Sequence, residues 1–282
     1  MEKFRYVLWV IGVAFTVLSL QAQTRRALVI GLGEQEDKNW TKINGDKDVP
    51  YVIEMLERSG YRDIVTLVNR QATKAGIVSA FSVMAGKCQK GDVVYVHFSG
   101  HGQLVTDING DEEDTWDESW IPYDAYLKYG EQDKGEKHLI DDEINRLLSD
   151  ISDKIGANGR LLVVVDACHS GDSSRGEDIG ETVRGVKDEF VIPIIKRGNA
   201  VKLVEDWLIL SACKDYQLNQ EMKNPQVGKL TYALYVTTSN GDITMENIKT
   251  FMSNNRGSLP QTPVLSGKTD KYNLSDFISI EP

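Results

Sequence analysis

The feature that most constrains the fold of this chain is a set of short, continuous apolar runs separated by amphipathic segments. The two clearest runs are Asp-Val-Val-Tyr-Val-His-Phe at 92–98 and Arg-Leu-Leu-Val-Val-Val-Asp at 160–166. Runs of this length, rich in β-branched residues, are typical of strands buried on both faces of a parallel sheet. The amphipathic segments between them supply helices that cover those faces.

The same alternation continues along the rest of the chain. Further strands are predicted at 26–33, 63–68, 206–212 and 263–265, and helices at 49–60, 73–86, 141–152 and 245–252, whereas 230–237 fits either. We therefore expect an α/β fold with a mostly parallel six-stranded sheet and helices on both faces. The stretch 103–133 is polar, rich in acidic side chains and contains several turn residues, and the segment 171–202 is expected to form a loop.

The first 23 residues have the layout of a signal peptide. A short basic start precedes a mostly apolar run at 6–20, and Gln-Ala-Gln follows at 21–23. The apolar run is too short to span a bilayer comfortably, although an uncleaved anchor stays open as an alternative. We expect removal of 1–23, a single domain over 24–282, and a secreted or periplasmic protein without stable membrane insertion.

Charge and cysteine content narrow the function further. The net charge of −10 argues against nucleic-acid binding, which needs basic surfaces facing phosphate. The cysteines are too few for a disulfide framework, and their odd number leaves at least one thiol unpaired within the chain: Cys88, Cys168 and Cys213. Such a thiol is a candidate nucleophile.

Two of the predicted strands end in reactive side chains flanked by glycine. One runs into Ser99-Gly-His101-Gly102, and the other into Asp166-Ala-Cys168-His-Ser-Gly. Parallel strands of one sheet place these ends at the same edge, where α/β proteins bind ligands. A thiol needs a neighbouring base or cation to become the attacking thiolate, and histidine supplies it. His101 and Cys168 are therefore the predicted catalytic pair.

These motifs resemble the catalytic motifs of metacaspases, within the wider caspase-like clan. Similarity extends from about residue 26 to 266 and includes the acidic segment 110–124, the helix start at 140–143 and the turn at 210–217. The resemblance implies the caspase–haemoglobinase fold and a cysteine endopeptidase. Two further histidines, His97 and His169, and the other two cysteines, Cys88 and Cys213, are expected to be structural.

The resemblance also implies roles for the catalytic residues. Cys168 would attack the scissile carbonyl and form a thioester acyl-enzyme, and His101 would protonate the leaving amine and then activate water. The backbone N–H groups of Gly102 and Cys168 would form the oxyanion hole. No third catalytic side chain is expected, and the chemistry requires no cofactor.

Metacaspases line their first substrate pocket with carboxylates and cleave after Arg or Lys. Asp166 and Ser99 match two pocket positions and Asp48 a third, with Asp46 as the alternative to Asp48. A buried carboxylate without a partner is costly, so it favours a substrate guanidinium. The expected partners are proteins or peptides with a basic residue before the cut.

Calcium activates many metacaspases through a cluster of aspartates. Asp117, Asp141 and Asp142 align with the candidate Ca2+ ligands, and hard oxygen ligands suit this ion. The further aspartate that the family carries after its cysteine has no clear match here, although Asp172 is nearby. A solvated acidic insert that binds no metal is the alternative.

The segment 171–202 is long for a connection within one domain. It contains basic residues of the type that an acidic pocket accepts, namely Arg175, Arg184, Lys187, Lys196, Arg197 and Lys202. Caspase-like enzymes commonly process this region, so we expect a zymogen that cuts itself there. Lys196-Arg197 is the preferred site because a flexible glycine follows it. An ordered, uncut surface loop is the alternative.

Two alternatives to a metacaspase-like peptidase stay open. One is an arginine-specific secreted peptidase of the clostripain or gingipain kind, which would share the dyad and the pocket chemistry. The other is a binding or scaffold protein on the same fold with a chemically idle dyad. Labelling of the thiol by a basic chloromethyl ketone separates the enzymes from the scaffold.

Overall fold

The computed structural model describes residues 23–110, 112, 114–168, 182–193, 206–257 and 259–280. A six-stranded sheet lies at its centre, with the strand order β2-β1-β3-β7-β8-β9. The strands are β1 (Arg25–Gly31), β2 (Asp63–Val68), β3 (Val93–Ser99), β7 (Arg160–Asp166), β8 (Leu208–Ser211) and β9 (Val264–Gly267). All neighbouring pairs in this sheet are parallel except β8 with β9. The predicted fold class is confirmed.

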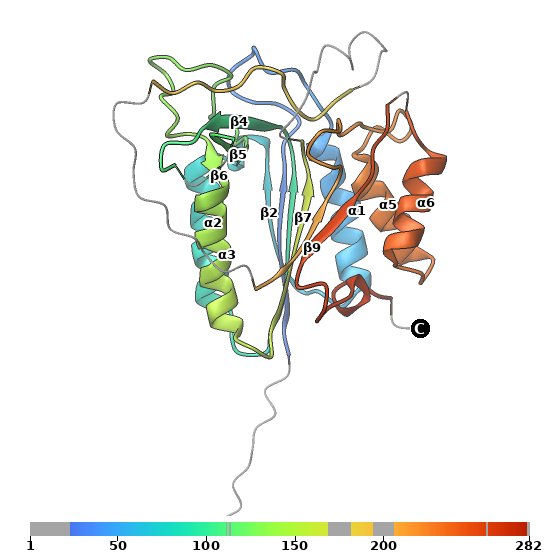
Figure 1. The fold of residues 1–282 in the computed structure, drawn as a ribbon. Coiled ribbons are helices and arrows are strands. Elements are labelled where there is room, and N and C mark those ends of the chain that lie inside the picture. The colour runs from blue at the N-terminus through green and yellow to red at the C-terminus, as the bar shows by residue number, and fades with distance from the viewer. Residues whose placement is uncertain are drawn as a thin grey trace, which may run out of the picture.

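Helices cover both faces of the sheet (Figure 1). One face carries α2 (Lys74–Lys87) and α3 (Asp141–Ile155); the other carries α1 (Gly45–Arg58), α5 (Lys229–Ser239) and α6 (Met245–Asn254). Two short 3-10 turns, η1 (Asn69–Gln71) and η2 (Leu274–Asp276), complete the elements on these faces. The segment whose pattern fits either helix or strand is thus the helix α5.

The continuous apolar runs are explained by two separate cores. Neighbouring residues of a strand point to opposite faces, so Val29 joins the core beneath α1 and α5, whereas Leu28 joins the core beneath α2 and α3. In the same way Val164 and Val163 of β7 belong to opposite cores. Because helices cover both faces of the sheet, successive residues of each strand are apolar whichever face they point to. The strands therefore show no alternation of apolar and polar residues.

A second, smaller sheet lies at one end of the central one, partly within the polar stretch 103–133, where the sequence pattern predicts no strand. Strands β4 (Gly102–Thr106), β5 (Trp116–Trp120) and β6 (Leu139–Ile140) pair antiparallel in the order β4-β5-β6. These strands are short, and β5 carries two acidic residues, so their composition resembles that of a loop. Their pairing with each other creates the sheet.

The helix boundaries follow local signals. α2 begins after Thr73, whose hydroxyl accepts a hydrogen bond of 3.0 Å from the Gly76 N–H. α1 begins at Gly45, earlier than the apolar periodicity predicts, because its first turn is polar. In the described part of the chain no helix is long and apolar enough to cross a membrane. The predicted signal peptide, apart from Gln23, lies outside the described residues, and export stays a prediction.

Candidate active site

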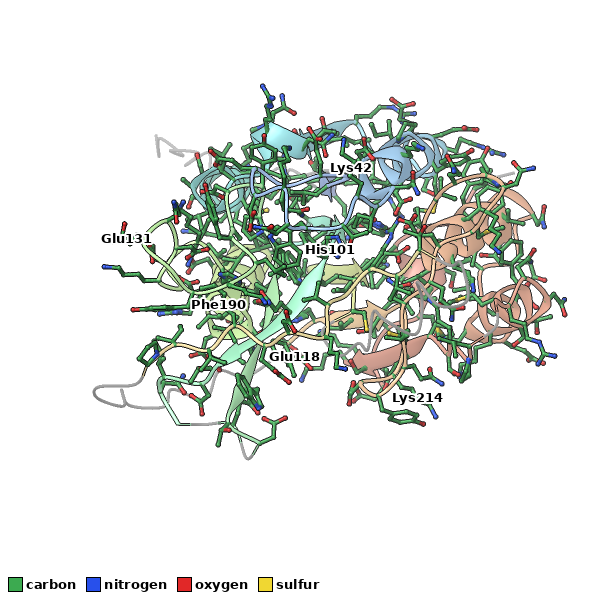
Figure 2. All side chains as sticks on the ribbon, turned by 90° about the horizontal axis from the view of Figure 1, so that it is seen from above. Lys42, His101, Glu118, Glu131, Phe190 and Lys214 are labelled. Atoms are coloured by element: carbon green, nitrogen blue, oxygen red, sulfur yellow. The ribbon has the colours of Figure 1, made fainter. Side chains whose placement is uncertain are left out.

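The site lies where β3 and β7 end side by side. Ser99 at the end of β3 pairs with Asp166 at the end of β7, so His101 and Cys168 each lie two residues past this pair. Figure 2 looks down on this edge and shows His101 near the centre, with Lys42 and Glu118 on opposite sides of it. The topology thus places the two predicted catalytic residues at adjacent strand ends.

His101 is fully buried and is oriented by a backbone group. Its Nε2 lies 2.7 Å from the carbonyl oxygen of Thr41, and its ring packs against Trp40 with 5.1 Å between ring centroids. A carbonyl only accepts, so Nε2 carries the proton and Nδ1 is the basic nitrogen. Among the described residues Nδ1 has no hydrogen-bond partner. Burial lowers the pKa of His101 to about 4, although the Thr41 hydrogen bond opposes this shift, so the ring is neutral at pH 7.

Cys168 is buried at the end of β7 and uses both its thiol and its backbone amide. The thiol donates to the Gln217 carbonyl oxygen at 3.1 Å. The backbone N–H donates to the carbonyl oxygen of Arg184 at 2.8 Å. The amide of the predicted nucleophile therefore holds a peptide carbonyl of the same chain, in the role expected of an oxyanion-hole donor.

The side chain of Arg184 fills a pocket of three carboxylates. Its Nη1 lies 2.6 Å from Oδ2 of Asp48 and 3.4 Å from Oδ1 of Asp166, and its Nε lies 2.9 Å from Oε1 of Glu221. Arg184, Asp48 and Asp166 are fully buried, and the Glu221 side chain is 2% exposed. Buried charges of this kind are stable only when they are paired and hydrogen bonded.

The pocket carboxylate of Asp166 is held by hydrogen bonds besides its contact with the guanidinium. Asp166 accepts hydrogen bonds from the Asn219 side chain (2.8 Å) and from the Thr231 N–H (2.9 Å) and hydroxyl (2.7 Å). Burial acts to raise the pKa of Asp166, but Arg184 and these hydrogen bonds outweigh it and lower that pKa. Burial raises the pKa of Asp48 to about 6. The three carboxylates hold the pKa of Arg184 well above its ordinary value in spite of its burial.

The backbone around Arg184 pairs as an added strand. Val183 forms an antiparallel bridge with Gln220. Two hydrogen bonds flank this bridge, from the Arg184 N–H to the Asn219 carbonyl (2.9 Å) and from the Glu221 N–H to the Thr182 carbonyl (3.0 Å). Pairing of an extended peptide with an exposed backbone edge is a general mode of peptide recognition. Segment 182–184 is thus bound as a peptide ligand would be.

The peptide bond after Arg184 lies directly against Cys168. Gly185 forms a parallel bridge with Gly102. A Cβ atom at Gly185 would lie only 2.9 Å from the Cys168 carbonyl oxygen and 3.2 Å from the Cys168 Cβ. The absence of a side chain at this position therefore permits the close approach.

The predicted pocket residues do not all act in the same way. Asp48, and not Asp46, reaches the guanidinium, because the Asp46 carboxylate accepts from Asn69 instead (3.3 Å). The hydroxyl of Ser99 lies 2.9 Å from Nε2 of His97, which in turn lies 3.2 Å from the Thr231 hydroxyl. Ser99 and His97 thus support the pocket indirectly, through the threonine that binds Asp166.

Two features of the site were missed by the sequence interpretation. Glu221 forms the third wall of the pocket and also accepts hydrogen bonds from Asn44, yet its surrounding sequence carries no recognisable motif. The carbonyl of Thr41 orients His101, and a backbone acceptor leaves no residue-type signal at all. No local sequence pattern indicates either feature.

The proposed calcium ligands lie on two elements. Asp117 belongs to β5, and Asp141 and Asp142 begin α3, where Asp142 accepts from the Asn109 side-chain amide. Burial raises the pKa of Asp141 to about 7, and neighbouring carboxylates add to this shift. The described residues contain no group of three His, Cys, Asp or Glu placed to hold a metal ion. Asp172 lies outside them.

Together, a histidine and a cysteine at adjacent strand ends, with a carboxylate pocket beside the cysteine, define a caspase-like site on a caspase-like fold. Residues 25–174 match the metacaspase, peptidase C14 domain family. The chain belongs to this family of peptidases.

Individual relatives agree with this assignment. The chain is 36% identical over 158 residues to metacaspase-1B of Aspergillus fumigatus and 30% identical over 155 residues to metacaspase-1A of Aspergillus niger. These matches cover 52% of this chain and 35% or 36% of the fungal proteins, so the chain spans about a third of its curated relatives.

Solved structures support the fold alone. A Geobacter sulfurreducens protein matches 92% of this chain with a TM-score of 0.65 and 24% identity, and the match covers all of that protein. Caspase-1 from Spodoptera frugiperda matches 87% of this chain and 89% of its own, with a TM-score of 0.59 and 10% identity.

Proposed function

We propose that the protein is a cysteine endopeptidase that cleaves after basic residues, and that its own chain is a substrate at the Arg184–Gly185 bond. The placement of Arg184 carries this proposal. Its guanidinium lies among three carboxylates, its carbonyl oxygen accepts from the Cys168 amide, and its own amide is paired as in a bound strand. These three contacts together are those of a bound substrate, and an ordinary surface loop is not expected to make all of them.

The reaction follows from the protonation states of the dyad. Nδ1 of His101 takes the Cys168 proton, and the thiolate attacks the carbonyl carbon of Arg184. Negative charge develops on the carbonyl oxygen, which the Cys168 N–H stabilises together with the N–H of Gly102. Collapse of this intermediate transfers the His101 proton to the nitrogen of Gly185 and leaves a thioester. Water, deprotonated by His101, then releases the new carboxylate of Arg184 and regenerates the thiol.

The shape of the pocket favours arginine over lysine. Asp48 and Asp166 approach Nη1, whereas Glu221 approaches Nε, so different atoms of the guanidinium meet different carboxylates. A lysine ammonium is a single compact charge that cannot donate from two separated nitrogens. An aspartate would place a fourth negative charge among three. Arginine is therefore the preferred residue before the cut, lysine is second, and aspartate is excluded.

The proposed self-cleavage site differs from the one that the sequence favours, Lys196-Arg197. Lys196 and Arg197 lie outside the described residues, whereas Arg184 occupies the pocket and Gly185 lies against the nucleophile. A cut after Arg184 would free the pocket for other substrates. We therefore propose Arg184–Gly185 as the first bond to be cut and leave 196–197 as a further site.

Purified protein is expected to separate into two fragments on a denaturing gel, with Gly185 as the new N-terminal residue. Arg184→Ala should stay whole at this bond and still cleave an added arginine peptide, because the dyad is unchanged. Arg184→Lys, which keeps the charge, is the matched control and should be cut more slowly. N-terminal sequencing that finds a first cut elsewhere, for example before Gly198, would contradict this assignment.

Calcium activation stays a prediction. The aspartate that the family carries after its cysteine has no clear match in this chain, so we expect weak calcium binding or none at Asp117, Asp141 and Asp142. Activity on an arginine peptide should fall in excess chelator, and the melting temperature should rise when calcium is added. Equal activity and equal melting temperature in both conditions would show that the acidic segment binds no calcium.

The alternatives are separated by one labelling experiment. An arginine chloromethyl ketone should label Cys168 in the processed protein, because the pocket directs the reagent to the thiol. A scaffold with an idle dyad would not be labelled. A clostripain-like or gingipain-like activity would be labelled equally, but membership of the metacaspase family does not favour it.

The proposal of export is tested separately, by determining the N-terminus of protein recovered from outside the cytoplasm.

A further inference from the structure

A second cysteine lies beside the proposed nucleophile. β7 and β8 are neighbouring parallel strands, and Val165 pairs with Ser211. Cys168 and Cys213 follow these paired residues by three and two positions. Neighbouring strands are separated by about 4.8 Å, so residues just past two adjacent strand ends can approach to the distance of about 4.4–6.8 Å between the Cα atoms of disulfide-bonded cysteines.

The two thiols also point to the same place. Both donate to the carbonyl oxygen of Gln217, at 3.1 Å for Cys168 and 3.4 Å for Cys213. Each sulfur thus lies within 3.4 Å of the same oxygen atom, and the neighbouring Cys168 thiol, together with burial, raises the pKa of Cys213. The two thiols are therefore neighbours, and the expectation that Cys213 is merely structural leaves this arrangement unexplained.

A cavity gives small molecules a route to this pair. It has a volume of about 580 Å³, and both cysteines line it together with apolar side chains of β7, β8 and β9, among them Val163, Ile209 and Val264. Side chains of α3 close another wall. The Arg184 pocket, in contrast, is lined by Asp48 of α1 and Thr231 of α5, which belong to the other face of the sheet. An oxidant the size of a peroxide thus approaches the thiols from the side of the sheet that carries α3.

We propose that Cys168 and Cys213 form a reversible disulfide when the protein meets a peroxide, and that Cys213 thereby protects the nucleophile from irreversible oxidation. Cys168 first attacks the peroxide, becomes a sulfenic acid and releases water or an alcohol. The sulfur of Cys213 then displaces hydroxide from the sulfenic sulfur, and the Cys213 proton converts that hydroxide to water. The two thiols lose two electrons, and the peroxide gains them. A dithiol reductant reverses the step.

The cross-link and its consequence are separate claims. Formation of the disulfide depends only on the contact between the two thiols. Loss of peptidase activity rests in addition on the proposed function of Cys168. The third cysteine, Cys88, lies at the C-terminal end of α2, and burial raises the pKa of its thiol to about 11. It provides a matched control that is buried and unreactive.

The cross-link is tested by peptide mapping of hydrogen-peroxide-treated protein after blocking of remaining thiols. Trypsin releases Cys168 in peptide 161–175, Cys213 in 203–214 and Cys88 in 88–90. The Arg184→Lys variant gives the same three peptides and limits self-cleavage during treatment. We expect peptides 161–175 and 203–214 joined by a disulfide. Recovery of both as sulfinic or blocked peptides, without the joined species, would overturn the proposal.

The protective role is tested by recovery of activity. Wild-type protein and Cys88→Ser should lose activity in peroxide and regain most of it in dithiothreitol. Cys213→Ser, measured against its own reduced activity, should regain little, because sulfenic Cys168 has no partner and proceeds to sulfinic acid. Equal recovery of Cys213→Ser and wild type would overturn this role. If the joined peptide forms in a protein without peptidase activity, the cross-link stands and the proposed function fails.

Discussion

Replacement of Cys168 by alanine is expected to abolish cleavage of an arginine peptide, with a loss of kcat on the order of 10⁶-fold, as for removal of a nucleophile in other covalent peptidases. No other described thiol has its backbone amide on the Arg184 carbonyl oxygen. The fold should be retained, because alanine fills most of the volume of the buried cysteine. Single-turnover kinetics and a thermal unfolding curve measure the two quantities.

The control for this prediction is Cys213→Ala. Its thiol shares the Gln217 carbonyl with Cys168, but Cys213 follows the neighbouring strand β8. This variant should keep measurable peptidase activity in reductant. Loss of activity in Cys213→Ala, with retention in Cys168→Ala, would show that the nucleophile has been assigned to the wrong thiol.

The placement of His101 and Cys168 at adjacent strand ends could be predicted from the sequence because the information about it is local. Each follows a continuous apolar run, and such a run predicts a buried parallel strand wherever it occurs. The carboxyl ends of parallel strands share one edge, so two reactive residues past two such runs must lie near each other. Register adds what the pattern lacks, namely that Ser99 and Asp166 are direct neighbours.

The occupant of the pocket could not be foreseen in the same way. Arg184 is one of six basic residues in the segment 171–202, and nothing in its local sequence distinguishes it from the others. Its position depends on pairing with 219–221 and on carboxylates from three distant parts of the chain. Contacts of this kind are set by tertiary structure. The small sheet β4-β5-β6 escaped prediction for the same reason.

The pocket explains why a family motif contains an aspartate two residues before the cysteine. Asp166 ends β7, so its backbone belongs to the sheet while its side chain turns toward α5, where Thr231 binds it. The rigid strand fixes the carboxylate at a constant distance from Cys168. Arg184, whose guanidinium meets Asp166, accordingly presents its carbonyl to the Cys168 amide. If the chain cleaves after arginine as proposed, the same contact serves both specificity and positioning.

Substitution of Asp166 by alanine is expected to lower kcat/KM for an arginine peptide by roughly 2–5 kcal/mol, the cost of removing one partner of a buried charge pair. This corresponds to a loss of about 30- to 5,000-fold, since each 1.36 kcal/mol is tenfold. Asp48→Ala should act in the same direction, because its carboxylate binds the same nitrogen. Rates are best measured on protein that has already been cut after Arg184, so that the intact Arg184–Gly185 segment does not compete with the added peptide for the pocket.

Asp46→Ala is the matched control, since Asp46 lies in the same helix turn as Asp48 but binds Asn69. Its kcat/KM should change little. The decisive comparison uses two peptides that differ only in arginine or glutamine before the cut. Asp166→Ala should lose most of the preference for arginine. The reason is that glutamine is uncharged and forms no ion pair with the Asp166 carboxylate, so its rate should change little. If both peptides slow by the same factor, Asp166 supports the fold of the site and does not read the charge of the substrate.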